Sequence, residues 1–191
     1  MTATIRRDLT VLDRDGELLR TYGGAALPLR GAVQDAADEE PFDVSAAHDR
    51  AMKEAMAEHA AALVADESVV LLDIGATTPL IARRLRGRPV MLGGVLRRNY
   101  QSLVGPLTER ALSQVSADLL FLSCTGVRAN GHVVDDMAVE EPIKRAMIEA
   151  ADRVVLVASE AKFPGTGSLR LCALSDIDVL VTTGGAQVLV A

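Results

Sequence analysis

The sequence predicts an α/β protein built around a parallel sheet, and three observations carry that prediction. The 191 residues are 49% hydrophobic and 24% charged, close to the average of soluble globular domains. Short apolar runs recur along the chain, and each is continuous rather than alternating, as in strands that are covered on both faces. Stretches with helical spacing separate these runs, and alternation of strand and helix is typical of a parallel sheet.

The apolar runs and the stretches between them define the expected elements in order. The expected strands are residues 69–72, 90–92, 119–122, 154–157, 179–181 and 188–190. The expected helices are residues 48–64, 79–85, 106–115 and 139–151. In the last of these helices, Val139, Ile143, Ala146 and Met147 share one face.

Two junctions between expected strands are unusually short. The segment 182–185 passes almost at once into the run that ends at Val190, and Gly87 leads directly to the strand at residues 90–92. Two parallel strands need a crossover of roughly a dozen residues or more, and neither junction has room for one. Either the local topology differs, or segments of the natural chain are absent from this sequence.

The composition disfavours several classes of protein. No apolar run approaches the roughly 20 residues that span a bilayer, and the N-terminus has no apolar signal-peptide core. Cys124 and Cys172 are too few for a disulfide framework and lack metal-ligand spacing, so we expect buried, reduced thiols and no metal or cofactor. Aromatic residues make up 3%, which argues against a stacking platform for single-stranded nucleic acid. Together these features favour the cytoplasm.

Charge divides the chain into two units. The net charge is −6, yet the first 30 residues hold five Arg against four acids. From Gln34 to Asp49 there are six acids and no Lys or Arg, a pattern typical of an acidic linker. We therefore expect an N-terminal unit over residues 1–30, a linker over 31–45 and a larger domain over 46–191.

The N-terminal unit combines a helix with a hairpin. Residues 2–15 place Ile5, Leu9 and Leu12 on one stripe of a helix and leave Arg6 and Arg7 off it. Residues 18–25 then form an apolar strand, a basic residue and a Gly-Gly turn. Such a helix fits the DNA major groove and such a wing fits the adjacent backbone. Composition alone favours an ordinary surface helix and hairpin.

A second motif, residues 72–79, places a polar turn after an apolar strand. We expect Thr78 to cap the following helix, with Pro79 at its first position. Gly75 lets the backbone approach a ligand, and the hydroxyl of Thr77 adds a donor beside the free N–H groups of a helix start, which suit an anion. A plain capped turn explains the residues equally well. Its place at the carboxyl end of a strand, where ligands of parallel sheets gather, favours the binding site.

Three more polar or Gly-rich loops follow expected strands and could meet at the same edge. They are residues 93–98, 123–126 and 159–163. Arg97 and Lys162 in these loops bring positive charge, which suits a phosphate group. Each loop alone is a weak signal, since a lone cation after a strand is usually solvated.

The segment TATIRRDLTVLDRDGELLRTYGGA closely resembles the end of the winged helix-turn-helix domain of DeoR-family bacterial transcriptional regulators. That family shares a TIRRDL recognition helix and a wing ending in GGA. The resemblance implies that Thr4, Arg6 and Arg7 lie on the DNA-reading helix, and Arg20 and Tyr22 on the wing. The family's first two helices would precede Met1, so this is a partial winged helix-turn-helix. We expect this chain to bind operator DNA poorly and an N-terminally extended version to bind it well.

The larger domain resembles the C-terminal effector domain of the same family, through DIGATT, LGGVLRRNYQSLVGP, Thr125-Gly126, EEPIKRAMI and SEAKF, in that order. The resemblance implies a Rossmann-like parallel-sheet fold similar to ribose-5-phosphate isomerase, which senses a phosphorylated sugar or related metabolite. The family has a further strand and helix between Arg88 and Met91. The implied effector-binding residues are Asp73, Gly75, Ala76, Thr77, Thr78, Gly93, Gly94, Arg97, Thr125, Gly126 and Lys162.

Two functions from different classes follow. The first is a DNA-binding repressor of sugar or nucleoside catabolism, with operator DNA and a phosphorylated sugar as partners. It would form a homodimer or higher even oligomer, because two-fold operators ask for two-fold proteins; helices 106–115 and 48–64 are apolar enough to supply the interface. The second is a sugar-phosphate isomerase-like enzyme, with an acid/base set drawn from Asp73, Asp135, Asp136, Glu140 and Lys162. A DNA-reading helix favours the regulator, with no catalytic residues.

Overall fold

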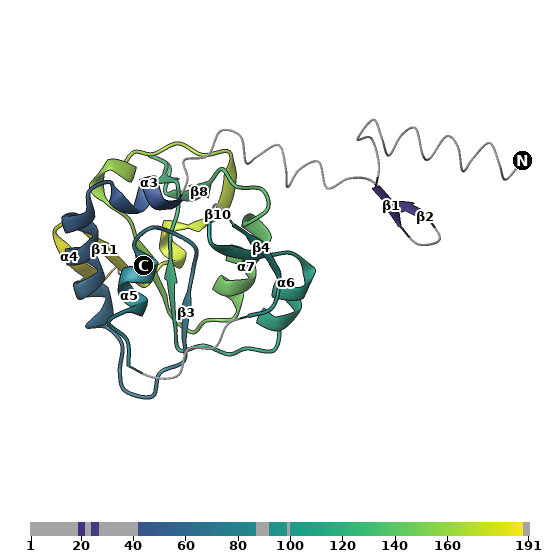
Figure 1. Ribbon diagram of the computed structural model, residues 1–191. Coiled ribbons are helices and arrows are strands. Elements are labelled where there is room, and N and C mark those ends of the chain that lie inside the picture. Colours follow the sequence, from purple (N-terminus) through teal and green to yellow (C-terminus); the bar gives the residue numbers. More distant parts are fainter. Residues whose placement is uncertain (1–18, 22–23, 27–41, 87–91, 99, 189–191) are drawn as a thin grey trace, which may run out of the picture. The chain divides into compact units, whose positions relative to one another are not determined.

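The computed structural model describes residues 19–21, 24–26, 42–86, 92–98 and 100–188. The chain divides into two compact units, Met1–Glu39 and Glu40–Ala191. In the first unit, β1 (Leu19–Thr21) and β2 (Gly24–Ala26) pair antiparallel, with Thr21 opposite Gly24 (Figure 1). The expected hairpin is confirmed. The helix expected over residues 2–15 lies outside the described residues.

The second unit is built on a five-stranded sheet with the strand order β12-β11-β9-β6-β3. Its four parallel strands are β3 (Val70–Leu72), β6 (Leu119–Leu122), β9 (Val154–Val157) and β11 (Val179–Thr182). They lie side by side in the order in which the chain forms them. The α/β class with a parallel sheet is therefore confirmed.

The fifth strand, β12 (Gly185–Val188), runs antiparallel to β11, with Thr182 opposite Gly185. An antiparallel neighbour needs only a tight turn, whereas a parallel one needs a long crossover. Gly185 has a φ of 115°, a conformation that favours glycine at such a turn. At this junction the local topology differs from a parallel pair, which explains its shortness.

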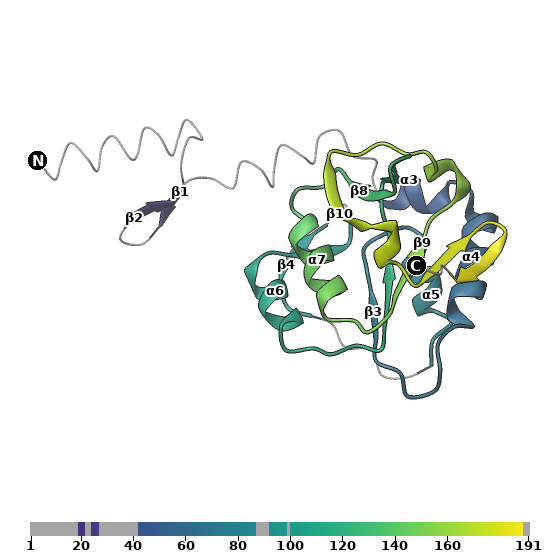
Figure 2. The same cartoon turned by 180° about the vertical axis from the view of Figure 1, so that it is seen from behind.

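Helices cover both faces of the sheet, as Figures 1 and 2 show from opposite sides. On one face, α4 (Arg50–Ala61) and α5 (Thr78–Ala82) pack on Phe121 and Val155. On the other face, α6 (Pro106–Leu112) and α7 (Glu141–Glu149) pack on Leu120 and Leu156. Neighbouring residues of β6 and β9 thus enter opposite cores, which is why these strands are apolar at every position.

The remaining strands form two small antiparallel sheets. One has the order β10-β8-β7, with β10 (Leu169–Ala173), β8 (His132–Asp135) and β7 (Gly126–Val127). The other pairs β4 (Val95–Arg97) with β5 (Ser102–Val104). Short 3-10 helices lie at Glu160–Lys162 and Leu174–Asp176.

The structure changes two expectations about chain segments. Of the strand expected over 90–92, residues 90 and 91 lie outside the described part, and Leu92 is not in a strand. Residues 95–97 form the hairpin strand β4. Arg97 therefore lies in a strand and not in a loop that follows a parallel strand. Within the segment expected as linker, residues 42–45 belong to the helix α3 (Phe42–Ala47).

Both cysteines lie in the core as free thiols, as expected. Burial raises the pKa of the Cys172 thiol to about 12, and burial also raises the pKa of Cys124. Within the described part of the chain, no helix is long and apolar enough to cross a membrane.

Candidate functional site

The carboxyl ends of β3 and β6 are tied together by Asp73. Its backbone N–H continues the sheet by donating to the Phe121 carbonyl at 3.0 Å. Its Oδ2 atom accepts hydrogen bonds from the backbone N–H and the hydroxyl of Ser123, each at 2.9 Å. Asp73 is buried, with 4% of its surface exposed. The first predicted site residue therefore faces the neighbouring strand.

Lys144 of α7 reaches the Asp73 carboxylate from the face of the sheet that α6 and α7 cover. Its ammonium nitrogen lies 2.7 Å from Asp73 Oδ2 and 3.3 Å from Asp135 Oδ2, and its side chain is 2% exposed. Burial alone would lower the pKa of Lys144, but the carboxylates of Asp73, Asp135 and Glu140 raise it above its ordinary value. The ammonium is thus charged and fixed between two carboxylates.

Asp135 closes this arrangement at the end of β8. Its Oδ2 meets Lys144, while its Oδ1 accepts the backbone N–H groups of Asp136 at 2.8 Å and Met137 at 3.2 Å. The hydroxyl of Thr125 also donates to this Oδ1, at 3.1 Å. The loop before α7 is therefore fixed to the strand ends of the main sheet.

One turn before Lys144, Glu140 binds the small hairpin. Arg97 of β4 forms an ion pair with Glu140, and both side chains are at most 10% exposed. The Ser102 hydroxyl of β5 donates to the same carboxylate at 3.2 Å. The guanidinium of Arg97 also lies 4.3 Å from the centre of the Tyr100 ring, a cation–π contact. We call Asp73, Arg97, Asp135, Glu140 and Lys144 the ionic cluster.

The turn before α5 differs in detail from the expectation. Thr78 is the first residue of α5 and not its cap, and its hydroxyl donates to the Gly75 carbonyl at 3.0 Å. Thr77 holds the cap position and makes no side-chain capping hydrogen bond. A Cβ on Gly75 would lie 3.0 Å from the Ser123 hydroxyl, so the close approach here is to Ser123. Ala76 and Thr77 are half-buried.

The other predicted glycines approach the protein itself. A Cβ on Gly94 would lie 2.1 Å from the Thr108 hydroxyl of α6, and that hydroxyl donates to the Gly93 carbonyl at 2.8 Å. A Cβ on Gly126 would lie 2.8 Å from the Cα of Gly165. Close packing therefore accounts for glycine at positions 94 and 126.

Two predicted polar residues remain near the surface. Thr125 is exposed, and Lys162 is half-buried and donates to the Cys124 carbonyl. The acid/base set considered from the sequence is only partly assembled. Asp73, Asp135 and Glu140 meet around Lys144, whereas Asp136 is exposed and accepts hydrogen bonds from Ser168.

Sequence reasoning missed Lys144 and Ser123. Lys144 lies in an expected amphipathic helix, where a lysine is normally solvated. The signal was its position beside Ile143, which is buried on the same helix. Within the described residues, no group of three His, Cys, Asp or Glu side chains could hold a metal ion.

The DNA-reading residues predicted from the sequence lie in the first unit. Thr4, Arg6, Arg7 and Tyr22 are outside the described residues. Arg20 lies in β1, opposite Ala25. The hairpin expected as the wing is thus present, and the helix expected to read the bases is not described.

Comparisons with known proteins match both units. The DeoR-like helix-turn-helix domain matches residues 2–30, and the DeoR C-terminal sensor domain matches residues 86–183. The transcriptional repressor AccR of Agrobacterium fabrum is 29% identical over 212 residues, covering 98% of this chain and 80% of the relative. The glycerol-3-phosphate regulon repressor of Haemophilus influenzae is 30% identical over 202 residues, covering 94% and 76%.

A third relative is the putative aga operon transcriptional repressor of Escherichia coli O157:H7, 29% identical over 207 residues, covering 96% of this chain and 76% of the relative. All three alignments are longer than this chain of 191 residues, so they contain gaps in this chain. The sensor-domain match alone covers more than half of the sequence, and the matches to the two domains follow each other in the order expected from the residues. The chain therefore belongs to the DeoR family of DNA-binding transcriptional regulators.

Proposed function

We propose that this protein is a repressor of an operon for sugar or nucleoside catabolism, released from its operator by a phosphorylated sugar or related metabolite. The observation that carries the proposal is the pairing of a helix-turn-helix match at residues 2–30 with a sensor-domain match at residues 86–183 in one chain. Two relatives are named as a glycerol-3-phosphate regulon repressor and a putative aga operon transcriptional repressor, and these names support this class of role. Such a regulator acts in the cytoplasm, beside the DNA.

The effector is proposed to bind at the carboxyl edge of the parallel sheet, near the turn before α5. Ala76 and Thr77 are reachable there, and Thr77 has a hydroxyl without a capping hydrogen bond. Exposed Thr125 follows β6 and half-buried Lys162 follows β9, and these two strands are neighbours in the sheet. We retain a ribose-5-phosphate isomerase-like fold as part of this proposal, because its parallel strands would place these loops at one edge.

We propose a sensor and not an enzyme, because each carboxylate of the ionic cluster is paired with a cation of the protein itself. Lys144 is charged and lies between Asp73 and Asp135. Glu140 binds Arg97 and Ser102. A general acid or base needs a group that reaches the substrate proton and titrates near the working pH, whereas the pKa of Lys144 is raised.

The proposed oligomer is a homodimer or higher even assembly. In α4, Met56, Ala57 and Ala60 already pack inside the unit, so this helix uses its apolar stripe internally. In α6, Leu107 is 64% exposed, so this second helix still has an apolar side chain available to a partner. Light scattering at micromolar concentration tests the assembly, and a monomer contradicts it.

Fluorescence anisotropy with DNA from the promoter of its own gene tests the regulatory role. In the N-terminally extended version we expect specific, salt-dependent binding that phosphorylated sugars weaken, because a ligand that favours the state with lower DNA affinity must release DNA. Arg6→Ala removes a proposed DNA contact and should weaken binding to the operator. Arg153→Ala, an exposed arginine of the sensor domain, is the matched control. Equal binding to operator and unrelated DNA, with or without sugar phosphates, contradicts the proposal.

Thermal shift measurements test the effector class. Phosphorylated sugars should stabilise the protein more than the free sugars do, because ligands stabilise the state that binds them. Thr77→Val removes one hydroxyl and should weaken the preference by roughly 1–2 kcal/mol, the scale of a hydrogen bond to a charged group. Thr183→Val changes a half-buried threonine in the β11–β12 turn and serves as the control. Equal responses to free and phosphorylated sugars contradict the assignment.

A further inference from the structure

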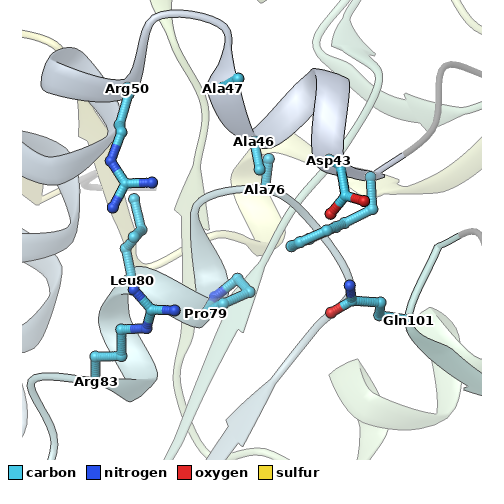
Figure 3. A pocket seen from close by; sticks show the side chains of 10 residues that line it. Asp43, Ala46, Ala47, Arg50, Ala76, Pro79, Leu80, Arg83 and Gln101 are labelled. Atoms are coloured by element: carbon cyan, nitrogen blue, oxygen red, sulfur yellow. The ribbon is translucent and has the colours of Figure 1, made fainter.

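A cavity of about 310 Å³ lies between α3, the start of α4 and the turn before α5. Ala76 of that turn and Pro79 of α5 line it, and so does Gln101 from the β4–β5 hairpin. Figure 3 shows Arg50 and Arg83 on one side of the cavity and Asp43 and Gln101 on the opposite side. None of the motifs found in the sequence includes Arg50 or Arg83.

The two sides of the cavity differ in charge. Arg50 uses its Nε–H to bind Glu54 at 2.9 Å, which leaves the terminal N–H groups of its guanidinium for another partner. Arg83 has no ion-pair partner among the described residues, and it is exposed. Across the cavity, the Asp43 carboxylate can accept hydrogen bonds, and the Gln101 amide can donate or accept them. Ala46, Ala76 and Leu80 supply apolar surface between the two sides.

The cations predicted from the sequence face other groups. Arg97 is bound to Glu140, and Lys162 donates to the Cys124 carbonyl. The ionic cluster contains three carboxylates and two cations, so its own charge does not attract an anion. Beside the turn at Ala76, the guanidinium groups that line a cavity are those of Arg50 and Arg83.

We propose that this cavity binds the effector, with the anionic group of the ligand between Arg50 and Arg83 and its hydroxyl groups toward Asp43 and Gln101. Guanidinium groups form strong, charge-assisted hydrogen bonds with phosphate and with carboxylate, so the ligand class is a small polyol that carries one of these groups. About 310 Å³ is at the lower end of ligand pockets, which fits a single sugar unit. The inference rests on the proposed function, and it places the anionic group of the ligand at Arg50 and Arg83 instead of at Lys162, which does not line this cavity.

Isothermal titration calorimetry on the whole chain tests the assignment, with glycerol-3-phosphate, glucose-6-phosphate, gluconate, glucose and inorganic phosphate as probes. We expect an anionic polyol to bind more tightly than glucose. Arg50→Gln and Arg83→Gln should each raise its Kd about tenfold or more, the range expected for loss of a charge-assisted hydrogen bond. Arg86→Gln removes the same charge from an exposed arginine that does not line the cavity and is the matched control.

The probes separate the two sources of negative charge. Tighter binding of the sugar phosphates identifies a phosphate site, and tighter binding of gluconate identifies a carboxylate site; both support the cationic cavity. Asp43→Asn should weaken the binding of the polyol ligand but not that of inorganic phosphate. The substitution changes only the side of the cavity that is proposed to contact the hydroxyl groups of the ligand.

Two results overturn the assignment in different ways. If the wild-type chain binds a sugar phosphate and Arg50→Gln and Arg83→Gln bind it equally well, the cavity is not the site and the proposed function stands. If the wild-type chain binds none of the anionic polyols, both the cavity assignment and the proposed effector class are wrong.

Discussion

Two groups of charged side chains border the turn from Asp73 to Thr78, and they differ in what they face. In the ionic cluster, Lys144 is 2% exposed and each cation is bound to a carboxylate of the protein. In the cavity beside α3, Arg50 and Arg83 are open to solvent. Charge near a predicted site is therefore not by itself a sign of ligand binding. The buried ion pairs connect elements of the fold, whereas exposed guanidinium groups are accessible to a ligand.

The strongest test of this contrast removes Lys144. Lys144→Met leaves buried carboxylates without their cation, and loss of one partner of a buried pair costs about 3–5 kcal/mol. We expect the free energy of unfolding in urea to fall by this amount. Arg145→Met on the next residue of α7 removes an exposed partner of Glu141 and should cost less than about 1 kcal/mol. Similar losses in both variants would contradict the distinction.

A second test concerns a predicted ligand contact that the structure packs against the protein. Gly126→Ala places a methyl group 2.8 Å from the Cα of Gly165, and overpacking of this kind costs about 1–3 kcal/mol. Gly93→Ala is the control, because nothing lies within 4 Å of the added methyl group. Chemical unfolding of both variants measures the difference. An unchanged stability in Gly126→Ala would return this glycine to the candidates for ligand contact.

The pH dependence of stability sharpens the contrast between buried and exposed groups. Burial raises the pKa of Cys172 from 9.0 to about 12, so between these values the folded state binds more protons than the unfolded state. Its contribution is complete below pH 9.0 and is lost as the pH rises toward 12, at up to about 1.4 kcal/mol per pH unit. Urea unfolding above pH 9 should show a shallower decline in Cys172→Ala. Parallel curves for the two proteins would contradict this account.

The smallest expected effect comes from the cavity. Arg83→Gln should change the free energy of unfolding by less than about 0.5 kcal/mol, because surface residues that form no ion pair with the described residues contribute little to stability. Its effect should appear in ligand binding instead. A loss of several kcal/mol in urea unfolding would show that Arg83 has a structural role, and the two groups of charges would no longer differ in kind.

The parallel sheet could be predicted because burial on both faces leaves a local signature. Residues 119–122 and 154–157 are apolar at every position, and β6 and β9 have these bounds. The β4–β5 hairpin could not be found in the same way. Its strands have three residues each, and in β4 both Val95 and Leu96 are exposed, so no alternation of buried and exposed positions marks that strand.

The candidate site was predicted in part. The turn after β3 and its hydroxyl groups are local features of the sequence, and they are present. The partners of its charges are not local: Lys144 is 71 residues from Asp73, and Glu140 is 43 residues from Arg97. Whether a lysine is solvated or buried between carboxylates depends on which strand ends meet, and spacing along one helix does not contain that information.

The long sequence separations in the ionic cluster have a consequence for the order of folding. Asp73 is 50 residues from Ser123 and 71 from Lys144, so these contacts require the closure of long loops. The cluster is complete only when β3, β4, β6, β8 and α7 have all assembled, since each contributes a charged group or a neighbour of one. We therefore expect these contacts to form after the folding transition state, where they stabilise the native state and slow unfolding. The ionic cluster should therefore set how long the sensor domain stays folded more than how fast it folds.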